Sequence, residues 1–79
     1  MQFVYILQSQ LDGSYYIGET HNVELRLQRH NEGWSRSTKG KRPWIVVHTE
    51  VYPSRTEALR REREIKSWKS RTRIEELFQ

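Results

Sequence analysis

The apolar residues of this 79-residue chain gather in short runs that predict strands early in the chain and again near its middle. Residues 2–8 and 43–52 are rich in strand-forming residues, and Pro43 opens the second run, where a missing N–H costs least. Residues 14–18 follow an Asp-Gly turn signal and are predicted to be the returning strand of a hairpin. The pattern therefore predicts one hairpin and one later strand.

Helical signals occupy the segment that follows the hairpin. A helix is predicted over residues 22–31, because Thr20 or Asn22 can cap its start and Gly33 can take the left-handed conformation that ends it. Residues 34–42 carry small, polar and cationic side chains with little to bury, so they are predicted to form an exposed basic loop.

Two more helices are predicted after the last strand. Ser54 and Glu57 can form a capping box, in which each side chain hydrogen-bonds the backbone N–H of the other residue, and a helix follows over residues 55–68. A short helix covers residues 71–78. The order β-β-α-β-α-α predicts an α+β fold in one small domain spanning residues 1–79.

The composition limits the classes of function. The chain has no cysteine, which excludes a disulfide scaffold and a thiolate metal site. No apolar run approaches the roughly 20 residues of a membrane span, and polar residues follow the first run too soon for a signal peptide. We therefore expect a soluble, cytoplasmic protein without a membrane partner.

The net charge of +4 is unevenly distributed. Residues 1–33 carry two arginines against four acidic residues, residues 34–53 carry four cations against one glutamate, and residues 54–79 carry eight cations against five glutamates. Such a surface attracts polyanions, of which nucleic acid is the expected one. A solvated, solubilising surface would explain the same charge.

One carboxylate of the predicted 55–68 helix lies where an apolar residue is expected. Glu62 falls in the middle of the apolar stripe, four residues after Ala58 and three before Ile65. A carboxylate there is costly unless it is paired or binds a cation. Periodicity favours a structural salt bridge with an arginine, and a metal ligand is the alternative.

The first predicted helix carries two candidate functional side chains. Arg26 and His30 are four residues apart on one flank of the apolar face that Val23 and Leu27 define. Arginine can clamp a phosphate with its planar fork, and histidine can exchange a proton near neutral pH. The alternative is that each is an ordinary solvent-exposed surface residue.

The hairpin brings two tyrosines together. A two-residue turn at residues 12–13 and a four-residue loop at residues 9–12 both place Tyr5 and Tyr16 on one face, directly opposite each other in the second case. An aromatic cross-strand pair would explain this arrangement. Gly18, which has no side chain, allows another group to approach the backbone and is expected to leave space for a phosphate.

Taken in order, these positions resemble the GIY-YIG nuclease family. The matching residues are V-Y-I at 4–6, Y-I-G at 16–18, Arg26, His30 and E-A-L-x-x-E at 57–62. The resemblance extends from Val4 to about Lys66 and is greatest to the small single-domain members of the family. It implies a three-stranded antiparallel sheet flanked by helices.

The resemblance also implies a chemistry, the hydrolysis of DNA phosphodiester bonds, with branched or damaged DNA as the candidate substrate. Glu62 would hold one divalent ion, Mg²⁺ or Mn²⁺, and Arg26 would neutralise the phosphate. Tyr16 or His30 would take the proton from water. Tyr5 would orient the water or the phosphate.

The chain also departs from the family pattern. Val4 replaces the glycine of the first motif, Glu19 follows Y-I-G where the excision-repair branch has a lysine, and the late asparagine has no match. Family members usually rely on a second domain or a partner for specificity. Two alternative hypotheses follow: a non-catalytic nucleic-acid-binding module that keeps the fold, and a nuclease subunit that requires a protein partner.

The cations of the second half of the chain are predicted to contact phosphates. They are Arg36, Lys39, Lys41 and Arg42 in the basic loop, and Arg60, Arg61, Arg63, Lys66 and Lys69 in and just after the 55–68 helix. Trp34, beside the loop, could stack on an exposed base, but packing against the sheet is the role we favour.

Overall fold

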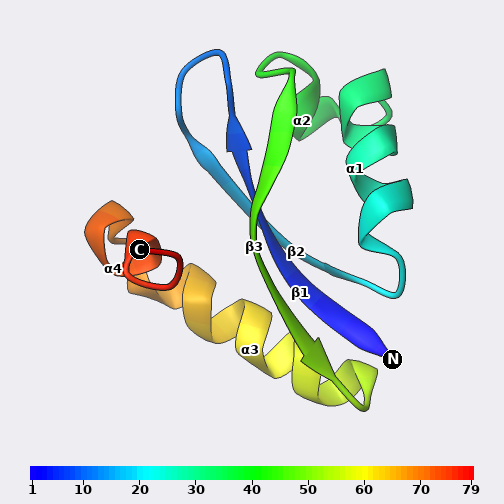
Figure 1. Cartoon of the computed structure of the whole chain (residues 1–79), viewed down its shortest axis with the longest axis vertical. Coiled ribbons are helices and arrows are strands. Elements are labelled where there is room, and N and C mark those ends of the chain that lie inside the picture. The colour runs from blue at the N-terminus through cyan, green and yellow to red at the C-terminus, as the bar shows by residue number, and fades with distance from the viewer.

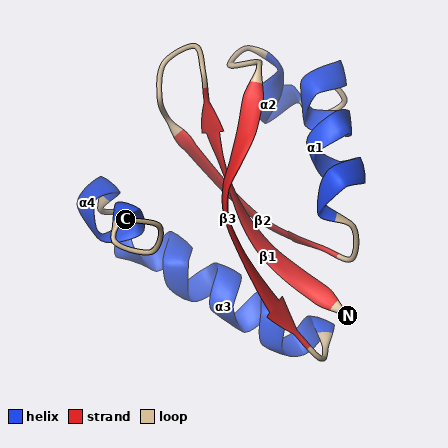
Figure 2. Cartoon of the chain, in the orientation of Figure 1, coloured by secondary structure: helices blue, strands red, loops and turns tan.

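The computed structural model describes residues 1–79 and contains three strands and four helices (Figure 1). Their bounds are Gln2–Ser9 for β1, Tyr15–Thr20 for β2, Val23–Glu32 for α1, Arg36–Lys39 for α2, Trp44–Tyr52 for β3, Arg55–Trp68 for α3 and Arg71–Glu75 for α4. The strands form one antiparallel sheet in the order β2-β1-β3 (Figure 2). The predicted α+β class and the three-stranded antiparallel sheet are therefore confirmed.

The sheet separates two helical layers, with α1 and α2 on one face and α3 and α4 on the other (Figure 1). The central strand β1 is buried from both sides, because alternate side chains point to opposite faces. Val4 and Ile6 pack toward α3, whereas Tyr5 and Leu7 pack toward α1. The continuous apolar run of β1 follows from this position between two layers.

The third strand changes face part-way along its length. Its pairing with β1 shifts between Ile6 and Leu7, which leaves Val47 as the extra residue of a β-bulge. Trp44 and Val46 consequently join the α1 layer, while Tyr52 packs on the α3 side. Even-numbered residues of β3 therefore pack on both faces of the sheet.

The hairpin confirms that Tyr5 and Tyr16 share a face, although its loop differs from both predicted loops. Four residues, 10–13, connect the strands, and the N–H of Ser9 donates to the carbonyl of Ser14 over 2.8 Å. Both tyrosines remain on one face because the observed register differs from each predicted one by an even number of residues. They are diagonal neighbours rather than directly opposite, with ring centroids 6.3 Å apart.

The caps observed at the two long helices largely agree with those predicted from the sequence. The side chain of Asn22 accepts a hydrogen bond from the N–H of Leu25 at the start of α1, and Gly33 ends it with φ of +87°. Ser54 caps α3 by accepting from the N–H of Glu57 over 3.3 Å. The capping box is incomplete, because the Glu57 carboxylate meets the hydroxyl of Ser54 instead of its backbone N–H.

The predicted basic loop contains a short helix, α2, so this part of the expectation is wrong. Thr38 is fully buried, and its carbonyl accepts a hydrogen bond from the Trp44 indole N–H over 2.9 Å. Asn31 also binds the backbone N–H and carbonyl of Trp44. The buried tryptophan therefore folds this polar segment back onto the domain.

No helix in the structure combines the length and apolarity that crossing a bilayer requires.

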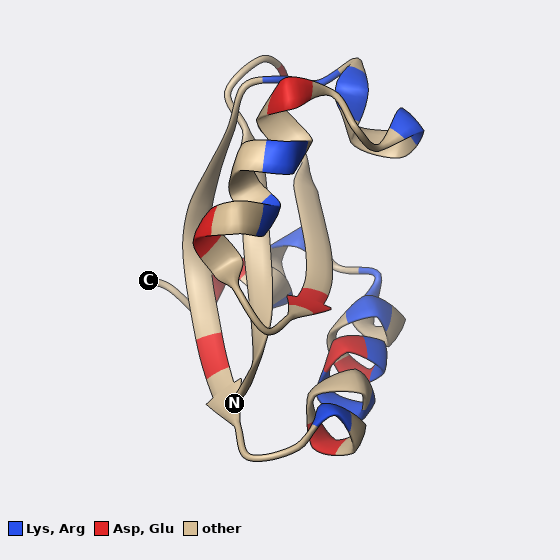
Figure 3. Cartoon of the chain, turned by 90° about the vertical axis from the view of Figure 1, so that its right-hand side faces the viewer, with Lys and Arg blue, Asp and Glu red and all other residues tan.

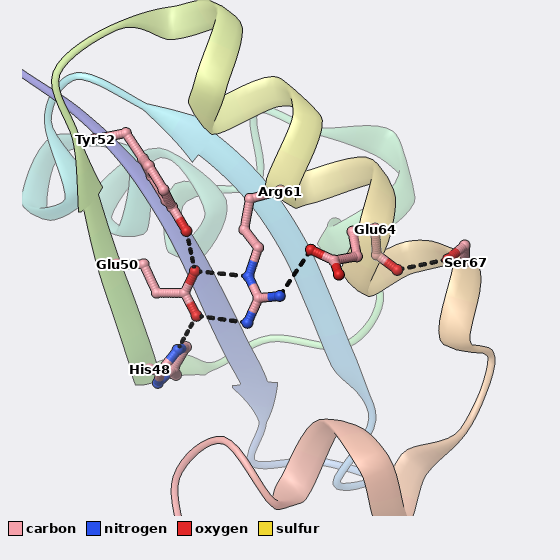
Figure 4. A network of polar contacts seen from close by, with 6 residues as sticks. All are labelled: His48, Glu50, Tyr52, Arg61, Glu64 and Ser67. Atoms are coloured by element: carbon pink, nitrogen blue, oxygen red, sulfur yellow. Dashed lines mark hydrogen bonds and ion pairs between the residues drawn. The ribbon is translucent and has the colours of Figure 1, made fainter.

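A polar network joins β3 to α3 (Figure 4). The Glu50 carboxylate accepts two hydrogen bonds from Arg61, at 2.9 and 3.2 Å, and one each from Tyr52 and His48. Arg61 also donates to Glu64 over 2.8 Å. The expectation that Arg61 contacts phosphate is therefore wrong, because its guanidinium is committed to two carboxylates.

The Glu50 network predicts how stability depends on pH. Burial alone would raise the pKa of Glu50, but hydrogen bonds from Arg61, His48 and Tyr52 outweigh it and hold the pKa at about 2. Because this value lies below that of the unfolded chain, the stabilisation is complete above the ordinary glutamate pKa and is lost as the pH falls through about 2.

We expect Glu50→Gln to lower the free energy of unfolding at pH 7 by about 2 kcal/mol, because charged hydrogen bonds to a little-exposed carboxylate are lost. The difference from wild type should shrink as the pH falls from about 4.5 toward 2. Urea unfolding at pH 7 and pH 3 measures both effects. Glu76→Gln, at an exposed glutamate, is the control. Equal unfolding of Glu50→Gln and wild type at pH 7 would contradict the prediction.

Candidate active site

Tyr5 lies at the centre of the α1 face and is only 1% exposed. Its Cα pairs with that of Gly18 on β2, and its ring crosses over that glycine. A Cβ atom added to Gly18 would lie 2.5 Å from the Tyr5 hydroxyl oxygen. The expectation that Gly18 leaves space for a phosphate is therefore wrong, because the Tyr5 ring fills that space.

A buried hydrogen-bond chain leads from Tyr5 through α1 to α2. The Tyr5 hydroxyl lies 3.1 Å from His30 Nε2, and His30 Nδ1 lies 2.8 Å from Thr38 Oγ1. The Thr38 hydroxyl donates to the carbonyl of Ser35 over 3.4 Å, so we assign the imidazole proton to Nδ1. Nε2 then accepts from Tyr5, and every group in the chain has a partner.

Burial also sets the protonation of this pair. It raises the pKa of Tyr5, as does the neighbouring Tyr16, while the positive Arg26 opposes the rise. Burial, followed by the charge of Arg26, lowers the pKa of His30 below its ordinary value. At neutral pH the Tyr5 phenol is therefore hydrogen-bonded to the uncharged imidazole of His30.

Tyr16 differs from Tyr5 because it is only partly buried. Its ring meets His30 edge-on, with centroids 4.8 Å apart, and meets Trp44 edge-on at 6.3 Å. The hydroxyl of Tyr16 makes no hydrogen bond to the protein. Gln2 Oε1 is the one buried side-chain N or O atom without a partner, so the unpartnered Tyr16 hydroxyl is not a buried atom. The Tyr16 hydroxyl is therefore open to solvent, and its ring lies beside the buried Tyr5–His30 pair.

Arg26 stands between two clefts, each of about 260 Å³, and makes no ion pair. Both clefts are also lined by Arg29. The first, here called the Arg55 cleft, is lined by Gln2, Glu19, Thr20, His21, Asn22, Leu25, Arg26, Arg29 and Arg55. The second, here called the Trp34 cleft, is lined by Arg26, Arg29, His30, Trp34 and Ser35.

Glu19 contributes one negative charge to the Arg55 cleft. Its side chain is 13% exposed and pairs with Arg55, with Oε1 and Nε 3.4 Å apart. Arg26 and Arg29 line the same cleft, so three cations oppose this carboxylate. The glutamate that follows Y-I-G therefore leaves the cleft net positive.

Glu62 projects from α3, on the other side of the sheet from α1. Its side chain is 15% exposed and pairs with Lys66 over 3.2 Å, so the predicted salt bridge exists but its partner is not an arginine. The negative charges of Glu62 and Glu19 both help to raise the pKa of Tyr5. Glu62 therefore lies within electrostatic reach of the tyrosine and histidine cluster.

The residues also fit a divalent ion held by a single carboxylate. No group of three or more His, Cys, Asp or Glu residues is arranged to hold a metal ion. Mg²⁺ in phosphate-processing sites is commonly bound by one or two carboxylates together with substrate phosphates and water. The little-exposed carboxylate of Glu62 meets that requirement, since its partner Lys66 is half exposed and can move aside.

The predicted phosphate-contacting cations fall into two separate groups. Figure 3 shows blue bands near α2 at the top of the view and alternating blue and red bands along α3 at the lower right. Apart from Arg61, all of these cations are exposed. Lys41 pairs with Asp12 over 3.5 Å, whereas Arg60 and Arg63 line a shallow hollow on α3.

Three residues of the site were not predicted from the sequence. Arg29 had a usable signal, because it lies three positions after Arg26 on the same helix. Arg55 and Thr38 had none, because each acts through a partner in another secondary-structure element. Trp34 is 69% exposed, so the favoured expectation that it packs against the sheet is wrong.

A sequence model described as the GIY-YIG catalytic domain matches residues 1–75. The chain belongs to the GIY-YIG family. It is 41% identical to a UPF0213 protein of Staphylococcus haemolyticus over 91% of this chain and 88% of that protein. It is also 42% identical to a UPF0213 protein of Halobacterium salinarum over 99% of this chain and 100% of that protein.

A solved structure also resembles this GIY-YIG chain. The solution NMR structure of a UPF0213 protein from Bacillus halodurans is 40% identical, with a TM-score of 0.60. The match covers 98% of this chain and 82% of that one. Family membership implies a nuclease-type activity, whereas the names of these relatives specify no substrate.

Proposed function

We propose that this GIY-YIG protein is an endonuclease that hydrolyses DNA phosphodiester bonds, with Tyr16, Arg26 and Glu62 acting at the scissile phosphate. One observation carries the proposal. A solvent-open tyrosine hydroxyl and an arginine without an acidic partner lie around the same buried Tyr5–His30 pair. A cation without an acidic partner and an accessible hydroxyl are what a phosphate and an attacking water require.

The buried pair supports Tyr16 rather than His30 as the group that meets the attacking water. His30 is 4% exposed, and its Nε2 already accepts a hydrogen bond from the Tyr5 hydroxyl. Burial and Arg26 also disfavour the imidazolium form. We therefore assign proton acceptance to the Tyr16 hydroxyl, which releases its own proton to solvent, and assign to Tyr5 and His30 the positioning of the Tyr16 ring.

Arg26 and Glu62 would act on the phosphate itself. The guanidinium of Arg26 would neutralise the charge that develops on the non-bridging oxygens as water attacks phosphorus and the 3′-oxygen leaves. The carboxylate of Glu62 would hold the divalent ion, Mg²⁺ or Mn²⁺. When bound, that ion supplies Lewis-acid stabilisation of the phosphate and of the leaving oxygen.

The test is an incubation of the pure protein with plasmid, single-stranded and branched DNA in Mg²⁺ or Mn²⁺, with EDTA as the metal-free control. We expect metal-dependent cleavage by the wild-type protein and about 10²-fold slower cleavage by Tyr16→Phe. Cleavage at the same rate by both proteins would overturn the assignment of Tyr16. DNA binding without cleavage under every condition would favour the non-catalytic binding module, and cleavage only after addition of lysate would favour the partner-dependent subunit.

A further inference from the structure

An exposed tryptophan lines the Trp34 cleft. Trp34 is 69% exposed, whereas Trp44 is 3% exposed. The guanidinium carbon of Arg29 lies 4.9 Å from the centroid of the Trp34 ring, which is a cation–π distance. Arg29 covers part of the ring, and the high exposure leaves the remaining surface open.

The backbone holds Trp34 in a defined position. Gly33 has φ of +87°, and its N–H donates to the carbonyl of His30 over 3.2 Å. The N–H of Trp34 donates to the carbonyl of Arg29 over 3.1 Å, which completes a Schellman motif at the end of α1. An apolar contact commonly accompanies this motif, and here the stacked Arg29 takes its place.

The Trp34 cleft extends to Arg26, which is proposed to act on the phosphate, and to His30 of the buried pair. Arg26 and His30 line the cleft together with Arg29 and Trp34. Arg26 and Arg29 have no acidic partners, so the cleft favours an anionic ligand over an apolar one. A flat aromatic surface beside free guanidinium groups suits a nucleotide, which combines a base with a phosphate.

We propose that Trp34 and Arg29 form a stacking platform for one unpaired base of the DNA strand whose phosphate lies at Arg26. This inference rests on the proposed nuclease function. A base inside a duplex has both faces covered by its neighbours, whereas an unpaired base can stack on an aromatic ring. The platform therefore favours substrates that are single-stranded next to the scissile bond.

The test is a binding measurement in EDTA, where no cleavage is expected. Fluorescence anisotropy compares a labelled single-stranded oligonucleotide with its duplex. We expect Trp34→Ala to weaken single-strand binding about 10- to 100-fold and duplex binding less than about threefold, because stacking on one aromatic ring is lost. Trp34→Phe should retain most of the affinity. Leu11→Ala, at an apolar residue of the hairpin loop that is 67% exposed, is the control.

Unchanged single-strand binding by Trp34→Ala, or an equal loss for single strand and duplex, would overturn the platform. The assay also separates this inference from the proposed function. Trp34-dependent single-strand binding without cleavage in any metal, with or without added lysate, would leave the platform standing and refute the nuclease. Metal-dependent cleavage with wild-type binding by Trp34→Ala would leave the nuclease standing and refute the platform.

Discussion

Glu62→Gln is expected to slow DNA cleavage by about 10³–10⁴-fold, because it removes the one carboxylate assigned to the divalent ion. The shape of the side chain is retained, but its negative charge is lost. The fold should survive, since Glu62 is 15% exposed and its one ion pair is with the half-exposed Lys66. Single-turnover cleavage at saturating DNA and at increasing Mg²⁺ or Mn²⁺ is the measurement.

Lys66→Gln is the matched control, because it breaks the same ion pair and keeps the carboxylate. If Glu62 served only as the partner of Lys66, the two variants would lose equal activity and equal stability. If Glu62 holds the ion, Lys66→Gln should cleave at close to the wild-type rate, apart from a modest loss of DNA affinity from one phosphate contact. Equal cleavage by the two variants would therefore refute the metal role of Glu62.

The local signals in the sequence were sufficient for the strands, the long helices and the shared face of Tyr5 and Tyr16. The tyrosine prediction survived a wrong loop because the face of a strand residue depends only on the parity of the register. The caps at Asn22, Gly33 and Ser54 act over three or four residues, so their residue types are informative without any tertiary contact.

The features that were not predicted depend on contacts between different secondary-structure elements. Helix α2 forms because the buried Trp44 binds the Thr38 carbonyl, and nothing within residues 34–42 signals that contact. The commitment of Arg61 to Glu50 likewise joins α3 to β3. The bulge at Val47 sends residues of one parity to both faces of the sheet, so alternation along β3 could not identify its buried side.

Contacts between elements also determine which cations are free to bind the substrate. Arg61 forms ion pairs with Glu50 and Glu64, and Arg55 pairs with Glu19. Arg26 and Arg29 carry no carboxylate partner, and both lie on α1 beside the buried tyrosine and histidine. The number of cations alone indicates the second half of the chain as the phosphate-binding surface. The ion pairs of the structure indicate instead that the unpaired guanidinium groups nearest the proposed catalytic residues belong to the first half.

Gly18→Ala is expected to destabilise the protein by about 3 kcal/mol, at the upper end of the usual cost of overpacking a core. The new Cβ would lie 2.5 Å from the Tyr5 hydroxyl oxygen, 2.6 Å from Cζ and 3.0 Å from Cε1. Tyr5 is 1% exposed and hydrogen-bonded to His30, so its ring cannot move away from a new Cβ without disturbing its buried surroundings. Either β1 and β2 separate or the Tyr5 hydroxyl leaves His30, and each outcome disturbs the ring of Tyr16.

Urea unfolding and cleavage assays measure these effects, with Gly40→Ala as the matched control. No heavy atom lies within 4 Å of a Cβ placed on Gly40, and its φ is −77°, so that substitution should be neutral or stabilising by up to about 1 kcal/mol. In a Tyr5→Leu background, where the clashing ring atoms are absent, Gly18→Ala should cost at least about 1 kcal/mol less than in wild type. An equal cost in both backgrounds would mean that Gly18 is required for substrate binding or for the backbone conformation, and not to leave room for the Tyr5 ring.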